Sequence, residues 1–457
     1  MDAVNKRTQP NMLEGSVFRG LMRMTWPIML MNVLQSLLSV IDMTVLGQMA
    51  DDSAVGSVGA CGMLISLFTG LFIGIATGSN VAAARHIGER RINDAKRAVG
   101  TSLWISLFSG VILLIAGNLL ARTVLIWNNC PATLLDNAAL YFKLYFAAAP
   151  FILLYNFCAS ILRATGDTKR PMLYLILAGV LKIALNIVLI LLLRNGIVAV
   201  GVSTILSNAV SGGLSLWALL KRDKVIGFRL SELCFDAREA KKIFFVGVPA
   251  GLQMSLYSLA NVVIFSAVNT FGEAATKGIS IANQFDGIVY QIAISPAYAT
   301  VSYVSQNAGA RNVARVRRSV ALSMLITVAF GASFGALSAL LSPRLASLMS
   351  SDPQVITYAG HKMLLISSTY FIAGLNNVMS ATLQGLEKPI VPTAGTLLYM
   401  CVLRLIWVYF IFPLWRHLTF LYLVWPIGWV LAILTSLCFY FPAIAKLKAN
   451  APPVPAG

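Results

Sequence analysis

Four ionisable side chains lie inside long apolar runs of this sequence, where charge is costly. The acids are Asp42, in "SLLSVIDMTVL", and Asp286, in "ISIANQFDGIVYQ", and the bases are Lys182 and Arg404. A charge at the centre of a membrane helix costs about 2.5–3.5 kcal/mol on insertion scales. A carboxylate in such a place can hold a proton or a hard cation, or it can pair with a base. One acid and one base in each half of the chain therefore predict ion-coupled chemistry within a membrane.

Composition supports a membrane protein over a soluble one. Of the 457 residues, 58% are hydrophobic and 11% are charged, whereas a soluble domain carries about 25% charged residues. The net charge of +18 does not indicate nucleic-acid binding, because the basic residues occupy short loops between apolar runs. The six cysteines and three histidines show no paired or clustered spacing, so neither a disulfide framework nor a metal site is predicted.

Twelve apolar runs are long enough to cross a bilayer, whose core needs about 20 apolar residues per helix. The predicted spans cover residues 26–48, 55–84, 99–125, 138–162, 171–193, 196–220, 243–271, 276–307, 320–341, 355–384, 392–414 and 420–442. An even number of spans places both termini on one side, and the Lys- and Arg-rich loops place that side in the cytoplasm. The sequence thus predicts an all-α, polytopic membrane protein with 12 transmembrane helices.

The two halves of the chain repeat each other. "GERRINDAKRAV" from Gly88 is similar to "GARNVARVRRSV" from Gly309, and "LRATGDTKRP" from Leu162 is similar to "LQGLEKPIVP" from Leu383, both at an offset of about 221 residues. Because each unit holds an even number of spans, the repeats are parallel and form two six-helix bundles. The predicted divisions are a cytoplasmic N-terminus (1–25), an N-terminal lobe (26–220), a cytoplasmic linker (221–242), a C-terminal lobe (243–442) and a cytoplasmic tail (443–457).

Three oxygen-bearing side chains of the first bundle fall in one membrane layer. At 1.5 Å per residue, Asp42 lies about 24 Å from the inner face, Asn186 about 22 Å and Thr204 about 18 Å. A carboxylate with neighbouring amide and hydroxyl oxygens is the ligand set of a hard cation, and the carboxylate alone can carry a proton. Asn186 and Thr204 are equally consistent with ordinary interhelical hydrogen bonds.

Three stretches of the sequence have a familiar pattern: "WPIMLMNVLQSLLSVIDMTVLGQM", "LRATGDTKRP" after the fourth span, and "GVPAGLQMSLYSLANVVI" at the seventh. Through them the chain resembles the multidrug and toxic compound extrusion (MATE) family over roughly residues 15–445. The resemblance implies cation-coupled efflux of organic substrates by rocking of two lobes. It also matches Asp42, Asn186 and Thr204 to a cation site in the N-terminal lobe.

This chain departs from the family near that site. Many members carry a second acid four residues after the Asn equivalent to Asn186, where this chain has Ile190, and it has Lys182 on the same helix face. One carboxylate fewer and one ammonium more favour protons over sodium. In the second lobe we expect Asp286 and Arg404 to form a charge pair, either functional or structural. Tyr257 stands where some relatives have a Glu.

Further polar side chains are candidates for lining a substrate cavity, although each could instead bond a neighbouring helix. They are Gln35, Asn156, Gln253, Tyr257, Asn283, Tyr290, Asn376 and Asn377.

We therefore expect a cation-coupled antiporter, driven by protons or sodium and needing no cofactor or metal, that exports amphipathic organic compounds, expected to be cationic, by alternating access. We expect a monomer in a bacterial inner membrane, with small organic substrates and no nucleic-acid partner. An alternative is a lipid-linked precursor or polysaccharide flippase of the same multidrug/oligosaccharidyl-lipid/polysaccharide exporter superfamily. Such a flippase would need a strongly basic cavity, whereas the intramembrane charges counted here balance.

Two other classes are less consistent with the sequence. An enzyme is not expected, because the spans contain no His/Glu metal motif, nucleophile triad or cysteine pair. A channel is disfavoured, because a two-lobe repeat is typical of alternating access.

Overall fold

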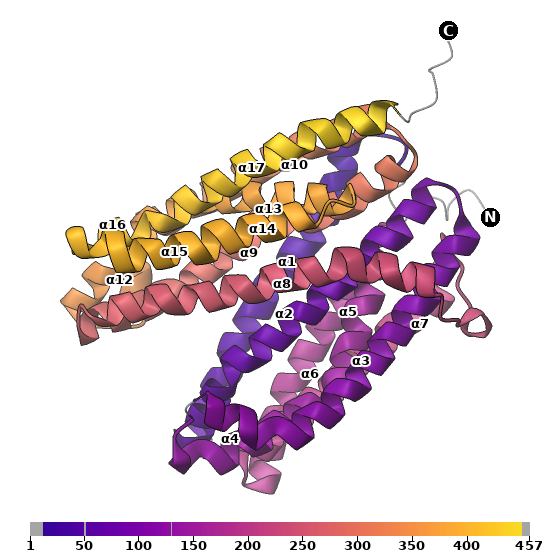
Figure 1. Cartoon of the computed structure of the whole chain (residues 1–457). Helices are drawn as coiled ribbons and strands as arrows, with labels where there is room; N and C mark the ends of the chain where they lie inside the picture. The colour runs from indigo at the N-terminus through magenta and orange to yellow at the C-terminus, as the bar shows by residue number, and fades with distance from the viewer. Residues whose placement is uncertain (1–11, 50–51, 129, 450–457) are drawn as a thin grey trace. The chain divides into compact units, whose positions relative to one another are not determined.

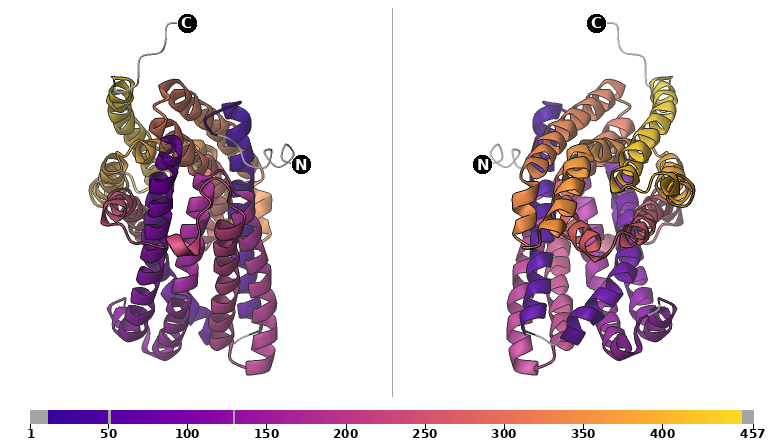
Figure 2. Two further views of the ribbon diagram at one scale, coloured as in Figure 1. Left: turned by 90° about the vertical axis from the view of Figure 1, so that its right-hand side faces the viewer. Right: turned by 90° about the vertical axis from the view of Figure 1, so that its left-hand side faces the viewer.

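The computed structural model describes residues 12–49, 52–128 and 130–449, and these residues form helices joined by short loops, with no strand among them (Figures 1 and 2). Nine of their helices are long and apolar enough to cross a membrane, and a tenth span forms if the bent pair α4 and α5 is counted. The first half contains α1 (Val17–Met49), α2 (Asp52–Gly88), α3 (Ile92–Trp127), α4 (Ala132–Ala147), α5 (Ala149–Ala164), α6 (Lys169–Leu193) and α7 (Gly196–Lys221).

The second half begins with the short helix η2 (Leu230–Glu232). It continues with α8 (Ala237–Asn269), α9 (Glu273–Gly309), α10 (Val313–Leu340), α11 (Ser342–Ser347), α12 (Pro353–Ile366), η3 (Ser367–Thr369), α13 (Tyr370–Gly385), α14 (Ile390–Gly395), η4 (Thr396–Val402), α15 (Leu403–Ile406), η5 (Trp407–Ile411), η6 (Phe412–Leu414), α16 (Leu418–Tyr422) and α17 (Val424–Ala449). Each of the twelve predicted spans therefore corresponds to one helix or to a run of consecutive helical segments. The predicted fold class is confirmed.

Four of the predicted spans consist of more than one helical segment, and two of these contain a bend or π-helical turns. The span at 138–162 consists of α4 and α5, which meet at Ala148 with a bend of 43°. The span at 392–414 contains two π-helical stretches, η4 and η5, on either side of the four-residue α15. π-helical turns are rare and occur frequently at functional sites.

The backbone shows the repeat directly. Arg90 and Arg311, in the turns that follow α2 and α9, both have positive φ, at 59° and 55°. Gly166 and Glu387 form the next equivalent pair, with φ of 91° and 59°. After each of the four, the next residue donates its N–H to the carbonyl five residues back, at 2.7–2.9 Å. Three of these positions hold a non-glycine residue in the left-handed region, which is strained for residues that have a Cβ. Both halves therefore keep the same turn geometry although it is strained at these positions.

Contacts divide the chain into two compact units, and each contains the start of the other repeat's first helix. Unit 1 comprises the described residues between 34 and 87 and between 91 and 248, and unit 2 comprises 12–33, 88–90 and 249–449. These divisions differ from the predicted lobes. Residues 26–33, predicted for the N-terminal lobe, belong to unit 2, and the predicted linker 221–242 belongs to unit 1.

In unit 2, the segment before α1 is bound to α9 and α10. The guanidinium of Arg315 donates to the carbonyls of Met12, Glu14 and Gly15, each at 3.0 Å, and Asn307 Nδ2 donates to the Met12 carbonyl at 3.1 Å. The beginning of α1 then packs its apolar face on the same two helices. These contacts explain why the start of the first repeat lies with the second.

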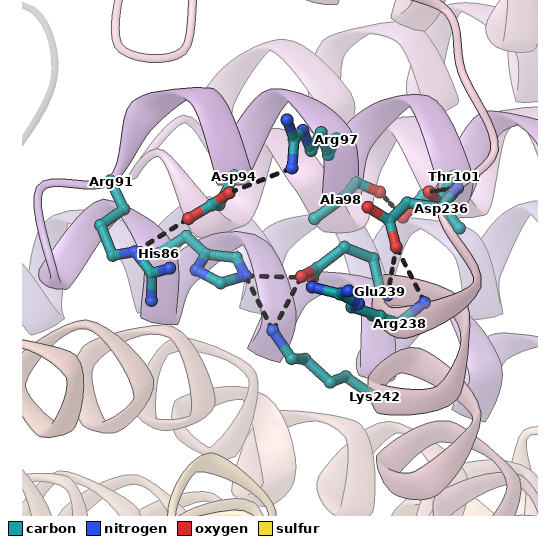
Figure 3. A network of polar contacts seen from close by, with 11 residues as sticks. His86, Arg91, Asp94, Arg97, Ala98, Thr101, Asp236, Arg238, Glu239 and Lys242 are labelled. Atoms are coloured by element: carbon teal, nitrogen blue, oxygen red, sulfur yellow. Dashed lines mark hydrogen bonds and ion pairs between the residues drawn. The ribbon is translucent and has the colours of Figure 1, made fainter.

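In unit 1, the segment before α8 is bound to α2 and α3 by a polar network (Figure 3). Asp236 Oδ1 accepts hydrogen bonds from the N–H groups of Arg238 and Glu239, and the N–H of Asp236 donates to Thr101 Oγ1 at 3.0 Å. Glu239 lies 3.0 Å from His86 Nε2 and 2.7 Å from Lys242 Nζ. The network fixes the start of α8 against the first repeat.

Two glycines let α2 and α8 approach closely within unit 1. A Cβ added at Gly78 would lie 2.1 Å from the Ile243 carbonyl oxygen, and one added at Gly247 would lie 2.6 Å from Ile75 Cα. Small residues at such crossings allow helix backbones to pack directly in a membrane.

Candidate functional site

The strongest candidate site lies in unit 1, around Asp42 of α1. Lys182 Nζ of α6 lies 2.7 Å from Asp42 Oδ2, and Asn186 Nδ2 donates to the other carboxylate oxygen. Ser203 Oγ of α7 donates to Asn186 Oδ1, which completes a chain across three helices. The side chains of Asp42 and Lys182 are 15% and 25% exposed, so the pair is largely shielded within the protein.

Local structure explains why these residues meet. Lys182 and Asn186 are four residues apart and therefore lie on one face of α6. Arg194 ends α6 in the left-handed conformation (φ 52°), and Asn195 caps α7 by accepting a hydrogen bond from the Val198 N–H at 3.1 Å. This tight turn makes α6 and α7 antiparallel neighbours, as predicted, and brings α7 beside Asn186.

The hydroxyl that hydrogen-bonds Asn186 belongs to Ser203 and not to the predicted Thr204. Thr204 Oγ1 is buried and donates to the carbonyl of Val200 in its own helix at 2.7 Å. A step of one residue turns a side chain by about 100° around the helix axis, which depth counting does not register. Ile190, where many relatives would carry a second acid, is buried and supplies no oxygen.

The hydrogen-bond donors around the Asp42 carboxylate decide which ions it can bind. Both oxygens of Asp42 accept hydrogen bonds from nitrogen, and the contact with Lys182 compensates its charge. Each oxygen keeps a free lone pair, but a sodium ion bound there would lie beside the ammonium of Lys182, whose positive charge repels it. A proton on Asp42 would need no added ligand and would release the ammonium of Lys182.

In unit 2, Asp286 of α9 pairs with Lys362 of α12 and not with Arg404. Lys362 Nζ lies 2.8 Å from Asp286 Oδ2, and both side chains are 3% exposed. Ser367 donates to Asp286 Oδ1 at 2.6 Å, and Lys362 also donates to the predicted cavity residue Asn283. The predicted Asp286–Arg404 pair is therefore wrong. The signal for Lys362 was present in the sequence, since it is the basic residue inside the tenth predicted span.

Arg404 of α15 is instead surrounded by neutral groups. Its Nη1 donates to Asn261 Oδ1 at 2.8 Å, and its guanidinium carbon lies 5.4 Å from the ring centre of Tyr257 and 5.5 Å from that of Trp425. The side chain is completely buried. Cation–π contacts of this kind stabilise a guanidinium without neutralising its charge.

The remaining cavity candidates fall into two groups. In unit 2, Gln253 donates to Ser380 at 3.1 Å, and the rings of Tyr257 and Tyr290 lie 6.3 Å apart within an aromatic cluster. Asn377 joins this cluster, because its side chain is hydrogen-bonded to that of Tyr290 and also donates to the carbonyl of Ala373. The others lie apart: Asn156 donates to a carbonyl of its own helix, Gln35 is exposed and Asn376 is buried. The described residues contain no group of three or more His, Cys, Asp or Glu placed to hold a metal.

A helical membrane protein built from two parallel repeats, with charge pairs inside its spans, has the architecture of a secondary transporter. The sequence model of the MatE family matches residues 27–188 and again residues 249–410, once in each repeat. The chain therefore belongs to the MatE family of multidrug transporters, and it is not an enzyme.

Individual relatives support this assignment. The chain is 28% identical over 386 residues to the probable multidrug resistance protein YoeA of Bacillus subtilis, with 83% of each chain covered. It is 22% identical over 364 residues to a FAD transporter of Shewanella oneidensis, covering 76% of this chain and 80% of that one. The crystal structure of MATE in the straight conformation superposes with a TM-score of 0.87 at 23% identity, covering 96% of this chain and 98% of the other, and shows the same fold.

Proposed function

We propose that this protein is a cation-coupled antiporter that exports amphipathic organic compounds, cationic ones among them, by alternating access of its two lobes. Several of its relatives are named for multidrug resistance or multidrug export. The observation that carries the coupling proposal is the contact of Lys182 with Asp42, which gives one carboxylate two charge states with different partners. A ligand that distinguishes two conformations shifts their populations, and a proton on Asp42 would do so by releasing Lys182.

Protons are the coupling ion that the site favours, with sodium secondary or absent. Both carboxylate oxygens of Asp42 are engaged by nitrogen donors, and Ile190 supplies no further oxygen. Concentrated negative charge and several oxygens are what sodium would require on leaving water.

The proposal also includes the membrane in which the protein lies and the side on which its termini lie. The basic loops favour an inner-membrane protein with both termini in the cytoplasm. We propose that it works as a monomer, since each of the two repeats supplies one half of the transporter.

The test is efflux of a cationic dye in proteoliposomes with the pH and sodium gradients imposed separately. Efflux driven by the pH gradient in the absence of sodium is expected. Efflux that requires a sodium gradient and ignores the pH gradient would overturn proton coupling, and no efflux under either gradient would overturn the antiport proposal.

The flippase alternative needs a strongly basic cavity for pyrophosphate. Two of the bases inside the membrane segments, Lys182 and Lys362, are each paired with an acid, and Arg404 contacts neutral groups. One guanidinium is far from a strongly basic cavity, so efflux remains the proposed function.

A further inference from the structure

The segment between α7 and α8 is fixed against α3. The N–H of Asp236 donates to Thr101 Oγ1 at 3.0 Å. A Cβ added at Gly100 would lie 3.0 Å from both the nitrogen and the carbonyl oxygen of Cys234, so the two backbones are in direct contact. The segment therefore has a defined place beside the third turn of α3.

The apolar side chains of this segment divide into two sets. Ile226 and Phe228 are 2% and 1% exposed and belong to a hydrophobic cluster of unit 1. Leu230, Leu233 and Phe235 are instead 61%, 37% and 59% exposed. We call these three residues the linker patch. Apolar side chains that gather on the surface of a packed segment are typical of an interaction site.

The linker patch lies on the side of α3 that faces lipid. Gly100, which contacts the segment, is followed at helical spacing by Trp104, Leu107 and Phe108, so all four occupy one face of the helix. The three large side chains are 43%, 55% and 65% exposed. Trp104 lies about 6 Å further along α3 than Gly100, and tryptophan is typical of the membrane–water interface. The linker patch is therefore placed at the level of the lipid headgroups.

The charges around the linker patch are complementary to anionic lipid. Four exposed basic residues accompany it: Arg229, Arg238 and Lys241 in the chain, and Arg97 on α3, three residues before Gly100 (Figure 3). The three acids of the stretch are each engaged by the protein, Glu232 by Lys96, Asp236 by N–H groups of α8, and Glu239 by His86 and Lys242. Basic residues beside an apolar surface attract the anionic lipids of the cytoplasmic leaflet.

We propose that residues 229–241 bind the surface of the cytoplasmic leaflet. The linker patch inserts among the lipids beside α3, and the basic side chains bind the phosphate groups of anionic phospholipids. The inference rests on the orientation given in the proposed function, with this segment on the cytoplasmic side. The segment predicted as a cytoplasmic linker then lies in the headgroup layer of the membrane.

The first test measures depth in the membrane. A fluorescent NBD label is attached at Ser231→Cys, which leaves the linker patch intact, in full-length protein whose other cysteines that are not fully buried are replaced by serine (Cys130, Cys234, Cys401 and Cys438). In nanodiscs of phosphatidylcholine and phosphatidylglycerol, a doxyl-labelled lipid should quench this label at least about threefold more than a label at Arg91→Cys. Arg91 is the matched control, because it is exposed and precedes Gly100 by nine residues, about 13 Å along α3.

The apolar side chains should cause the difference. Adding Leu233→Ser and Phe235→Ser to the Ser231→Cys protein is expected to remove about half of the quenching or more. Equal quenching at positions 231 and 91, or quenching at 231 that ignores the loss of both apolar side chains, would overturn insertion of the linker patch.

The second test measures binding of a fluorescent phosphatidylglycerol to the purified protein in detergent. The triple variant Arg229→Gln, Arg238→Gln, Lys241→Gln should bind it about tenfold more weakly than wild type or worse. The control removes the same charge elsewhere on unit 1, through Arg91→Gln, Lys169→Gln and Lys224→Gln, all exposed residues, and should change the affinity by less than about threefold. Equal losses in the two triple variants, or none in the first, would overturn the lipid site.

Orientation is checked with the Arg91→Cys protein. A membrane-impermeant maleimide should react with it in inverted vesicles and not in right-side-out ones. The reverse result would refute the proposed orientation and with it the assignment to the cytoplasmic leaflet. Correct orientation combined with a failed depth or lipid-binding test would refute this inference alone.

Discussion

The Nζ atom of Lys182 lies 2.7 Å from Oδ2 of Asp42, although residue counting places the two Cα atoms about 8 Å apart in depth. The long side chain of Lys182 covers that difference, as lysine side chains do near membrane interfaces. The pair therefore links α1 to α6 at the one acid of α1.

Asp42→Asn should abolish gradient-driven efflux and leave expression intact. The amide cannot carry the exchangeable charge, while it matches the carboxylate in size. Dye efflux from inverted vesicles measures the effect. Asp136→Asn is the matched control, because the Asp136 side chain is 82% exposed, and it should behave as wild type. Wild-type efflux by Asp42→Asn would remove the carboxylate from the coupling mechanism.

Asp42 and Lys182 should show strong energetic coupling in a double-mutant cycle. Asp42→Asn or Lys182→Gln alone leaves a shielded charge without its partner, which for buried pairs costs about 3–5 kcal/mol. The double variant loses both charges and should be more stable than the sum of the two single changes, with a coupling energy of about 0.5–3 kcal/mol. Thermal unfolding in detergent measures the four proteins. Additive effects would show that the contact contributes nothing to stability.

Asp286 and Lys362 should be coupled more tightly than Asp42 and Lys182. Both side chains are 3% exposed, so a single neutralisation leaves a charge with almost no access to water. Lys362→Met and Asp286→Asn should each lower the melting temperature more than the equivalent changes in unit 1, and the double variant should recover most of the loss. If Arg404→Gln, measured in parallel, rescued Asp286→Asn, the pairing found here would be contradicted.

Ser203 should matter to transport more than its neighbour Thr204. Ser203→Ala removes the hydroxyl that holds Asn186 against Asp42 and is expected to slow efflux about fivefold, the value of one neutral hydrogen bond of roughly 1 kcal/mol. Thr204→Val preserves shape and removes only a bond within α7, so the rate should change by less than about twofold. A reversed order in the efflux assay would favour Thr204 as the site residue.

Gly78→Ala should destabilise unit 1, because its methyl group would lie 2.1 Å from the Ile243 carbonyl oxygen. The backbone cannot rotate away as a side chain can, so α2 and α8 must separate, at about 1–3 kcal/mol for such overpacking. Gly59→Ala on the same helix meets no atom within 4 Å and is the control, expected to be neutral or slightly stabilising. Equal melting temperatures for both variants would show that the crossing is looser than described.

Local sequence patterns were enough to predict the helical fold class, the duplication and which acids lie inside apolar spans. Apolar length specifies a membrane span, and an acid within such a span stands out against its neighbours. The repeat is visible because the turns after α2 and α5 recur after α9 and α13, and a tight turn depends on few residues.

Which side chains meet depends on the packing of the helices. Depth along a helix follows from residue number, but the direction of a side chain around the axis depends on how neighbouring helices pack. For that reason Ser203 replaced Thr204, and Lys362 replaced Arg404 as the partner of Asp286. The placement of residues 12–33 in unit 2 depends on contacts of Arg315 and Asn307 with a segment about 300 residues away in the chain. Such contacts form only when distant segments pack together, so a local sequence pattern does not predict them.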